Sequence, residues 1–310
     1  MKIGFEKTNK LNHARQPVMA TIATADFDKT IKAYQSALGY NLVEQSVVTR
    51  GTARHWGLVG LEGVRLALMQ PTSGAPVFFR FVEISNKTPQ VPSCGWFALE
   101  ICVQDVEALY KRLMKKNSGF APFSEPMPLA FTDCVYPMQC RGPAGEILYL
   151  NQVRGSLPEI DLPLASSTVD HLFIAILSAT DMEAANEFYC EAMDMKVNER
   201  HEIAYKTINR VYSLPLDTLH SLSTLGGPRH VSLEVDQYPG LSNTPRAATF
   251  ETLKEGILMV SFITETFDAV PERAVVEAPK SFGHAPYNGA ESLVFIGPAA
   301  ERTELIKLPH

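Results

Sequence analysis

The sequence predicts an α+β chain of two tandem domains, each formed by paired βαβββ units that build a curved mixed sheet around a cleft. Residues 169–189 contain an apolar run from His171 to Leu177, a short turn with capping residues, and apolar residues at helical spacing. Residues 16–34 follow the same plan at a constant offset of 155 positions, which aligns Gln16 with His171. A repeat about half the chain long indicates a duplicated domain.

Length and composition agree with two globular domains. The chain has 310 residues, of which 45% are hydrophobic and 20% charged, and its net charge is -6 with a pI near 5.8. It has no basic run, no apolar run of the roughly 18 residues that a membrane span needs, and a polar N-terminus. The five cysteines include no CxxC pair, which is typical of reduced thiols. We therefore expect a cytoplasmic protein that acts on a small molecule, without nucleic acid or membrane, and leave a homodimer open.

The elements of the first half follow in order from their patterns. A polar extension, 1–15, precedes the strand 16–23 and the helix 28–38, which Gly39 ends. The connection 86–94 is marked by Pro, Ser and Gly, and a second strand and helix follow it at 96–103 and 105–114. The remaining expected strands are 41–49, 53–69, 77–84, 134–139 and 147–153. We place the first domain at 16–153.

The second half repeats this order after a linker at 154–168, which has two prolines and no periodicity. Its first strand leads into a helix at 183–193, and a second helix near 267–273 should be short because it contains Pro271. A loop is expected at 237–245. The expected strands are 171–177, 196–205, 207–225, 230–235, 257–263, 292–295 and 303–308. We place the second domain at 169–310.

The unit order, the helix pattern after the first strand, and the turns Gly142-Pro143-Ala144-Gly145 and Gly297-Pro298-Ala299-Ala300 resemble the vicinal oxygen chelate superfamily. This superfamily contains glyoxalase I, bleomycin-binding proteins and type I extradiol dioxygenases. The resemblance covers nearly the whole chain and implies two glyoxalase-like domains. Because the superfamily hosts several chemistries, the resemblance predicts the fold better than the reaction.

The resemblance also implies a divalent metal ion in the cleft, with His171, Glu234 and Glu304 as its ligands in the second half. The fourth ligand position falls on Met259. A histidine with two carboxylates suits Fe, Mn, Zn, Ni or Co. The matching positions of the first half cannot bind a metal, so that half should be a metal-free copy; they are Gln16, Val82 or Glu83, Ala98 and Tyr149.

Three further residues are candidates for catalysis. His230 has the same strand parity as Glu234 and should face the same side. His284 lies in a Gly/Pro-bounded loop before the closing strands, where loops on a rigid scaffold often carry catalytic groups. Tyr287, three residues later, is a plausible neighbour for substrate oxygens.

These residues favour a metal-dependent lyase or isomerase acting on a small oxygenated metabolite. One alternative is an extradiol-type ring-cleavage dioxygenase for a catechol-like substrate. Met259 is evidence against this alternative, because it occupies the position of the second histidine ligand. The other is a metal-free small-molecule binding protein of the bleomycin-resistance type, which the missing ligands suit. The sequence shows no basic cluster for glutathione or a CoA phosphate.

Overall fold

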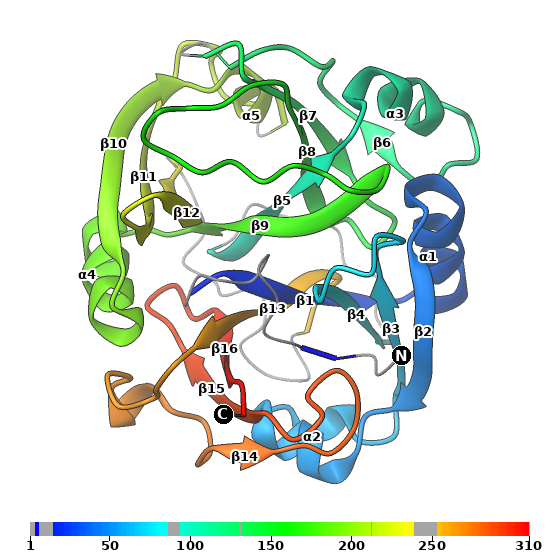
Figure 1. The fold of residues 1–310 in the computed structure, drawn as a ribbon, viewed down its shortest axis with the longest axis vertical. Helices are drawn as coiled ribbons and strands as arrows, with labels where there is room; N and C mark the ends of the chain where they lie inside the picture. The colour runs from blue at the N-terminus through cyan, green and yellow to red at the C-terminus, as the bar shows by residue number, and fades with distance from the viewer. Residues whose placement is uncertain are drawn as a thin grey trace.

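A computed structural model shows the arrangement of the elements (Figure 1). It describes residues 4–5, 15–85, 94–129, 132–211, 213–238 and 253–309. The expected extension 1–15, the connection 86–94 and the loop 237–245 lie almost wholly outside these ranges. No helix within them combines the length and the apolar character needed to cross a membrane.

Strands of the described residues form two eight-stranded sheets, here called sheet 1 and sheet 2 (Figure 1). In spatial order, sheet 1 consists of β14 (Lys280–Ser281), β15 (Glu291–Ile296), β16 (Arg302–Lys307), β13 (Gly256–Thr264), β1 (Pro17–Thr24), β4 (Phe78–Glu83), β3 (Arg65–Gln70) and β2 (Asn41–Val47). Sheet 2 consists of β10 (Lys196–Ala204), β11 (Leu219–Gly227), β12 (His230–Gln237), β9 (Val169–Ser178), β5 (Gly95–Val103), β8 (Ile147–Val153), β7 (Val135–Arg141) and β6 (Ala121–Pro122).

Short helices join these strands. They are α1 (Phe27–Ala33), continued by the π-helix η1 (Tyr34–Leu38), then α2 (Arg50–His55), η2 (Val59–Leu61), α3 (Val106–Leu113), α4 (Met182–Met193), α5 (Lys206–Val211) and the 3₁₀ turn η3 (Glu272–Ala274). Gly39 ends the first helix at a positive φ of 78°, as expected. The helix expected at 267–273 is reduced to η3, which starts after Pro271.

The two paired sheets are present, but each takes one βαβββ unit from each half of the chain. Sheet 1 joins the first unit to the last through β1 and β13, and sheet 2 joins the second unit to the third through β5 and β9. The domain boundaries expected at 153 and 169 therefore do not separate the two sheets, since β8 and β9 on either side of them lie in sheet 2. This pairing decides which side chains can share a cleft.

The two sheets pack against each other through their largest apolar cluster, with α1, α3 and α4 contributing to it. Trp96 of β5 contacts the ring of Phe262 of β13 and donates a hydrogen bond to the backbone oxygen of Arg302 at 2.7 Å. Ala20 and Ile22 of β1 face this core, so Thr21 points to the opposite face of sheet 1. Each sheet thus has one face in the common core and one face turned away from it.

The sequence repeat is matched in the structure by a repeated tyrosine–glutamate hydrogen bond. Tyr34 donates a hydrogen bond to Glu146 at 2.6 Å, and Tyr189 donates to Glu301 at 2.6 Å, with the same offset of 155 positions between the two pairs. In each pair the carboxyl group lies buried under a Gly-Pro-Ala turn. Each tyrosine lies in the helical segment of one sheet's unit and its glutamate in a turn of the other, so these bonds tie the sheets together.

Two expected strands begin later than the sequence pattern indicates, because each is preceded by a short helix. The run 53–69 begins inside α2 and contains η2 before β3, and the run 207–225 begins inside α5 before β11. Thr49 caps α2 by accepting a hydrogen bond from the Thr52 N–H, a local signal that the apolar run obscured.

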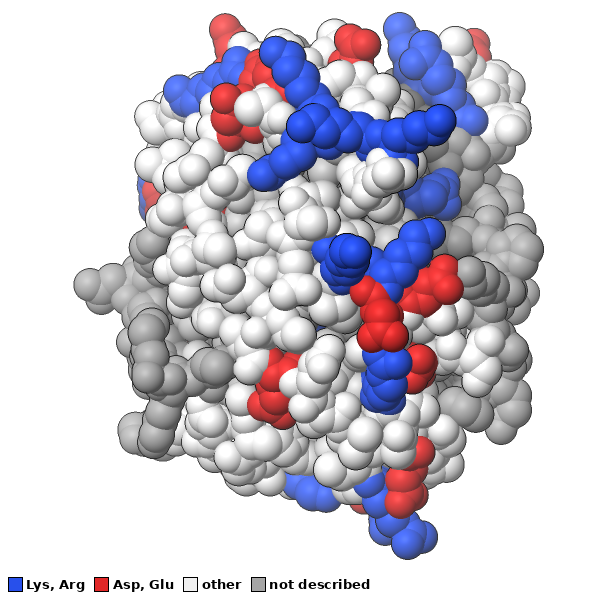
Figure 2. All heavy atoms as spheres, turned by 90° about the vertical axis from the view of Figure 1, so that its right-hand side faces the viewer, with Lys and Arg blue, Asp and Glu red and all other residues white. Residues whose placement is uncertain are grey.

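The side of the molecule that carries α1, β2 and α3 is shown in Figure 2. Lysine and arginine side chains gather toward its upper end, where α3 lies and ends with Lys111 and Arg112. Positive charge is favourable at a helix C-terminus. Arg65 pairs with Asp28 in an exposed ion pair of the kind that contributes about 0–1 kcal/mol. This face is a solvated surface of mixed charge.

Candidate functional site

A buried ion pair lies on the outward face of sheet 1. Arg80 Nη2 on β4 is 3.2 Å from Glu304 Oε2 on β16, and neither side chain is more than 3% exposed. The strands between them, β13 and β1, carry the small residues Ser261 and Thr21 beside Glu304 and Arg80. These small side chains leave room for the long arginine and glutamate to meet above the sheet.

Both carboxylate oxygens of Glu304 are saturated with hydrogen-bond donors. Oε1 accepts from the hydroxyls of Tyr287 at 2.6 Å and Ser292 at 2.7 Å, and Oε2 accepts from Ser261 at 2.5 Å and from Arg80. A carboxylate offers about four lone-pair sites, so none is left over. Burial favours the neutral acid, but Arg80 and the three hydroxyls outweigh it and hold the pKa of Glu304 below its ordinary value.

Arg80 is held from several directions. Its Nε donates to Thr21 Oγ1 at 2.9 Å and its Nη1 to the Tyr287 hydroxyl at 2.6 Å. The guanidinium carbon lies 4.3 Å from the centre of the Trp56 ring, a cation–π contact. With the bond to Glu304, contacts to described residues use three of the five N–H donors of a guanidinium. The other N–H groups can donate to an oxygen atom placed beside Arg80.

A cavity of about 150 Å³ adjoins the ion pair. Its lining mixes apolar and polar residues, among them Trp56, Leu66, Leu68, Arg80, Tyr287 and His284. His284 is exposed, and its Nδ1 lies 2.8 Å from the backbone oxygen of Ala285. That contact requires the hydrogen on Nδ1, which leaves a lone pair on Nε2 when the ring is neutral.

The structure divides the sequence-predicted site residues between the two sheets. Sheet 1 and its loops bring together His284, Tyr287 and Glu304, whereas His171, His230 and Glu234 belong to sheet 2. The three expected metal ligands, His171, Glu234 and Glu304, therefore do not form one coordination sphere. The reason is the unit pairing, which puts the last strand of the chain in a different sheet from β9 and β12.

On sheet 2, Glu234 belongs to a group of three acidic side chains with Glu100 and Asp236. Asn151 donates to Glu100, and the Tyr238 hydroxyl donates to Asp236. Burial raises the pKa of all three groups, to about 7 for Glu100 and about 6 for Asp236, and their mutual repulsion adds to the effect at Glu100 and Glu234. Near neutral pH this group holds protons rather than a full set of negative charges.

His230 starts β12 opposite Gly227, at the turn from β11. Glu234 is four positions farther along the strand, a distance of about 13 Å. The register of β12 against β11 shifts between Val231 and Leu233, so equal parity does not put the two side chains on one face, and at that distance His230 does not adjoin the Glu234 carboxyl group.

Known proteins resemble this chain in sequence and in fold. Residues 10–148 match the model of the Glyoxalase/Bleomycin resistance protein/Dioxygenase superfamily. This part of the chain belongs to that superfamily. No curated protein matches the sequence significantly.

Solved structures extend the likeness to the whole chain. Glyoxalase I from Zea mays is 17% identical, with a TM-score of 0.63 over 95% of this chain and 92% of its own. A putative dioxygenase from Bacillus subtilis is 11% identical, with a TM-score of 0.60 over 96% of this chain and 86% of its own. At such identities the likeness concerns the fold alone, which is the tandem glyoxalase-superfamily fold predicted from the sequence.

The cleft of sheet 1 does not fit the metal ion that the resemblance to this superfamily implies. Glu304 has no lone pair left for a metal, and the guanidinium of Arg80 already places a positive charge against it. Met259, at the position expected for a histidine, is buried in an apolar cluster. The donor set of this cleft is that of a closed ion pair and not of a coordination site.

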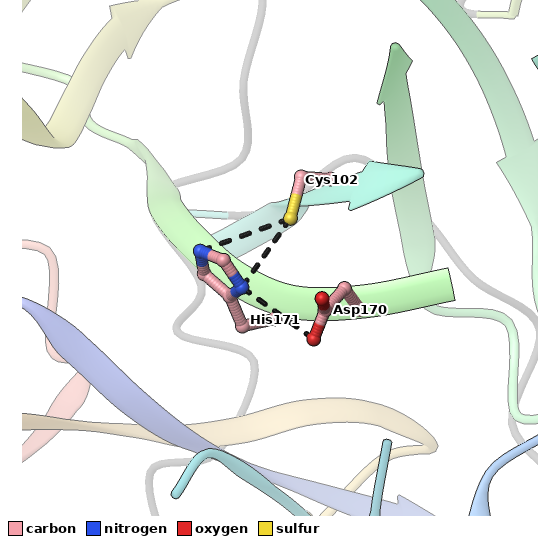
Figure 3. A group of neighbouring side chains, drawn as sticks. All are labelled: Cys102, Asp170 and His171. Carbon is pink, nitrogen blue, oxygen red and sulfur yellow. Dashed lines mark hydrogen bonds and ion pairs between the residues drawn. The ribbon is translucent and has the colours of Figure 1, made fainter. Parts of the chain in front are cut away.

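One group of three side chains elsewhere does bring metal-ligating atoms together. Within the described ranges, Cys102, Asp170 and His171 place one ligand atom each within 4.8 Å of the others (Figure 3). Cys102 comes from β5, and the other two residues come from the start of β9. His171 is the one sequence-predicted ligand in this group.

Sequence reasoning missed Arg80, Trp56, Cys102 and Asp170. A signal for Arg80 was present, because it is the one charged residue in the apolar run 77–82. An arginine in a buried strand is rarely tolerated unless it is paired. Cys102 and His171 had no comparable signal, since 69 positions separate them and only the antiparallel pairing of β5 with β9 brings them together.

Proposed function

We propose that this protein binds a small oxygenated organic molecule in the cavity beside Arg80 and that this binding needs no metal ion. The observation that carries the proposal is the buried Arg80–Glu304 pair. A fixed guanidinium with unused N–H groups can hold a carbonyl, phenolic or carboxylate oxygen through charge-assisted hydrogen bonds. Arg80 then supplies the positive charge that a metal ion would otherwise place beside the same oxygen.

The cavity limits the size and shape of the ligand. A cavity of about 150 Å³ has room for one benzene ring. Trp56, Leu66 and Leu68 contribute apolar surface to its lining, and Arg80 and Tyr287 contribute polar groups. A single-ring or similarly small compound with one oxygen-bearing substituent matches this combination.

The other functions expected from the sequence, a metal-dependent lyase or isomerase and a ring-cleavage dioxygenase, both need metal ligands. The saturated Glu304 favours the metal-free binding protein over them. One observation supports catalysis as a second candidate: His284 lies at this cavity with its hydrogen on Nδ1. In that case Nε2 of His284 would remove a proton next to the ligand carbonyl while Arg80 stabilises the enolate oxygen.

A substitution at the cavity entrance tests the binding proposal without touching the ion pair. Ser46 is an exposed residue of β2 that lines the cavity, and Gln45, its neighbour, is exposed but does not line it. Phenols, aromatic ketones and aromatic acids are titrated by calorimetry into protein treated with EDTA. We expect the compound that binds best to lose at least about 10-fold in affinity in Ser46→Trp, about 1.4 kcal/mol, and to bind Gln45→Trp normally. Binding that disappears with EDTA, or that survives unchanged in Ser46→Trp, contradicts the proposal.

The catalytic candidate has its own test. A bound ketone is incubated with the protein in D₂O, and exchange of the hydrogens next to its carbonyl is followed by NMR. We expect His284→Gln to slow any exchange by about 100-fold or more, the usual contribution of a general base, with His201→Gln as the control at an exposed histidine on β10. Equal exchange rates in the two variants would exclude His284 as the base.

A further inference from the structure

The group Cys102, Asp170 and His171 lies where the end of β5 meets the start of β9. These strands run antiparallel, with Ile101 beside Leu172 and Val103 beside Val169. Figure 3 shows the three side chains pointing toward one another from the two strands. Cys102 and the Asp170 side chain are each 1% exposed, and the His171 side chain is 12% exposed, so the group is buried but can be reached from solvent.

Two distances within the group match those between ligands of one zinc ion, and the three ligand atoms all lie within 4.8 Å of one another. Cys102 Sγ is 3.4 Å from His171 Nδ1, which is 3.5 Å from Asp170 Oδ1. Zinc binds sulfur at about 2.3 Å and nitrogen or oxygen at about 2.0–2.2 Å in tetrahedral geometry, which separates neighbouring ligand atoms by about 3.3–3.6 Å. The two measured distances fall in that range.

Hydrogen bonds account for these contacts only with a long bond from the Cys102 thiol. His171 Nδ1 faces both the thiol of Cys102 and the carboxylate of Asp170. With a hydrogen, Nδ1 can donate to Asp170 but cannot accept from the thiol; without one, it can accept from Cys102 but faces Asp170 lone pair to lone pair. With the hydrogen on Nδ1, the thiol can donate only to Nε2, and the sulfur lies 3.8 Å from that nitrogen, which is a long contact. A cation satisfies the three groups at once because each contributes a lone pair.

The surroundings of Asp170 hold its carboxylate in place. Ser73, in the loop between β3 and β4 of sheet 1, donates to Oδ1 at 2.6 Å, and the backbone N–H of Ser166 donates to Oδ2. Hydrogen bonds to a ligating carboxylate fix its orientation and are a regular part of metal sites. The site thus lies at the seam between the two sheets, away from the residues that line the cavity.

We propose that Cys102, Asp170 and His171 bind one Zn²⁺ ion, with the fourth coordination position open to solvent on the exposed side of His171. A thiolate with an imidazole and a carboxylate suits zinc better than a hard cation such as Mg²⁺. Bound zinc links β5 to β9 and, through Ser73, sheet 2 to sheet 1. The site is separate from the metal set expected from the sequence and shares only His171 with it.

Metal content and cobalt spectroscopy test this site. Protein made without a histidine tag is loaded with Zn²⁺ or Co²⁺, desalted, and measured by elemental analysis and absorption. We expect one ion per chain and, with Co²⁺, a near-ultraviolet band from charge transfer between thiolate and metal. Cys102→Ser should lose the band and His171→Gln should lose the ion, whereas Cys94→Ser, which alters another buried cysteine beside β5, should keep both.

Two outcomes overturn the proposal. One is folded wild-type protein that retains no zinc after desalting, and the other is a cobalt band that persists in Cys102→Ser. Circular dichroism of each variant checks folding, and zinc should raise the Tm of the wild type but not of His171→Gln. The proposed zinc site and the proposed ligand cavity share no residues. Ligand binding in the sheet 1 cavity should therefore survive in His171→Gln.

Discussion

Replacing Arg80 with methionine should lower the free energy of unfolding at neutral pH by about 3–5 kcal/mol, because it leaves a buried carboxylate without its charged partner. Glu304 is fully buried, and the three hydroxyls that remain cannot supply a charge. Methionine keeps much of the volume of the arginine stem, so the loss reports the missing charge more than a cavity. Urea denaturation followed by fluorescence measures it.

The double variant Arg80→Met, Glu304→Gln separates charge from packing. Glutamine keeps an acceptor for the surrounding hydroxyls and removes the uncompensated charge, so the double variant should regain most of the stability that the single variant loses. Arg229→Met is the matched surface control. Its partner is Asp161, both side chains are 53% exposed, and the loss should stay below about 1 kcal/mol. A double variant less stable than Arg80→Met would contradict this account of the pair.

The loss of stability in Arg80→Met should also depend on pH in a defined direction. The pKa of Glu304 is lowered in the folded wild type, so its contribution is present above its unfolded pKa and is lost as pH falls through the folded one. Without Arg80, burial dominates and the folded pKa rises. The stability difference between wild type and Arg80→Met should therefore shrink as pH falls from 7 toward 4.

The repeated architecture could be predicted from the sequence because its signals are local. The strand, capping residues and helix that contain Tyr34 recur with Tyr189, and the Gly-Pro-Ala turns recur with Glu146 and Glu301. The structure joins these same features in equivalent hydrogen bonds. The pairing of the units could not be predicted in this way. Four similar units contain no local feature that assigns β1 to β13 and β5 to β9, since these contacts join strands distant in the sequence.

The prediction of the candidate sites was limited in the same way, by contacts between residues that are distant in the sequence. Glu304 was predicted from its turn and strand to be a metal ligand, whereas the structure pairs it with Arg80, 224 positions earlier in another unit. Because the sequence left the unit pairing open, Glu304 was grouped with His171 and Glu234 rather than with Arg80. Tyr287 was predicted to be a neighbour of substrate oxygens, and in the structure its hydroxyl forms hydrogen bonds with Arg80 and Glu304. Side chains within one unit were easier to place than those that meet across units.

The second large expected effect is a loss of stability as pH rises. It arises from two buried carboxyl groups at equivalent positions of the repeat. Burial raises the pKa of both Glu146 and Glu301 to about 7, although hydrogen bonds from Tyr34 and Tyr189 favour their charged forms. A raised folded pKa means that the folded state binds the proton more tightly than the unfolded state does. The resulting stabilisation is fully present below the unfolded pKa of about 4.3 and is lost as pH rises through about 7.

The wild type should therefore become less stable between pH 5 and pH 8, with each of these groups contributing up to about 3 kcal/mol, since one pKa unit corresponds to about 1.4 kcal/mol. Glu100 and Asp236 add to the trend in the same direction, so the whole slope cannot be assigned to one pair. Glu146→Gln with Glu301→Gln isolates the repeated pair, because glutamine keeps the acceptor for each tyrosine and does not titrate. Its unfolding free energy should vary less with pH than that of the wild type.

Glu187→Gln is the control, because this residue is exposed on α4, the helix that carries Tyr189. Its urea midpoint should follow the wild type at every pH. If the double variant also follows the wild type, then Glu146 and Glu301 do not retain their protons on folding. If instead its slope is smaller, the two carboxyl groups are protonated in the folded chain at acidic pH, and their ionisation lowers its stability as pH passes 7 because each charge is buried. The repeated pair would then set the pH range in which the folded chain is most stable.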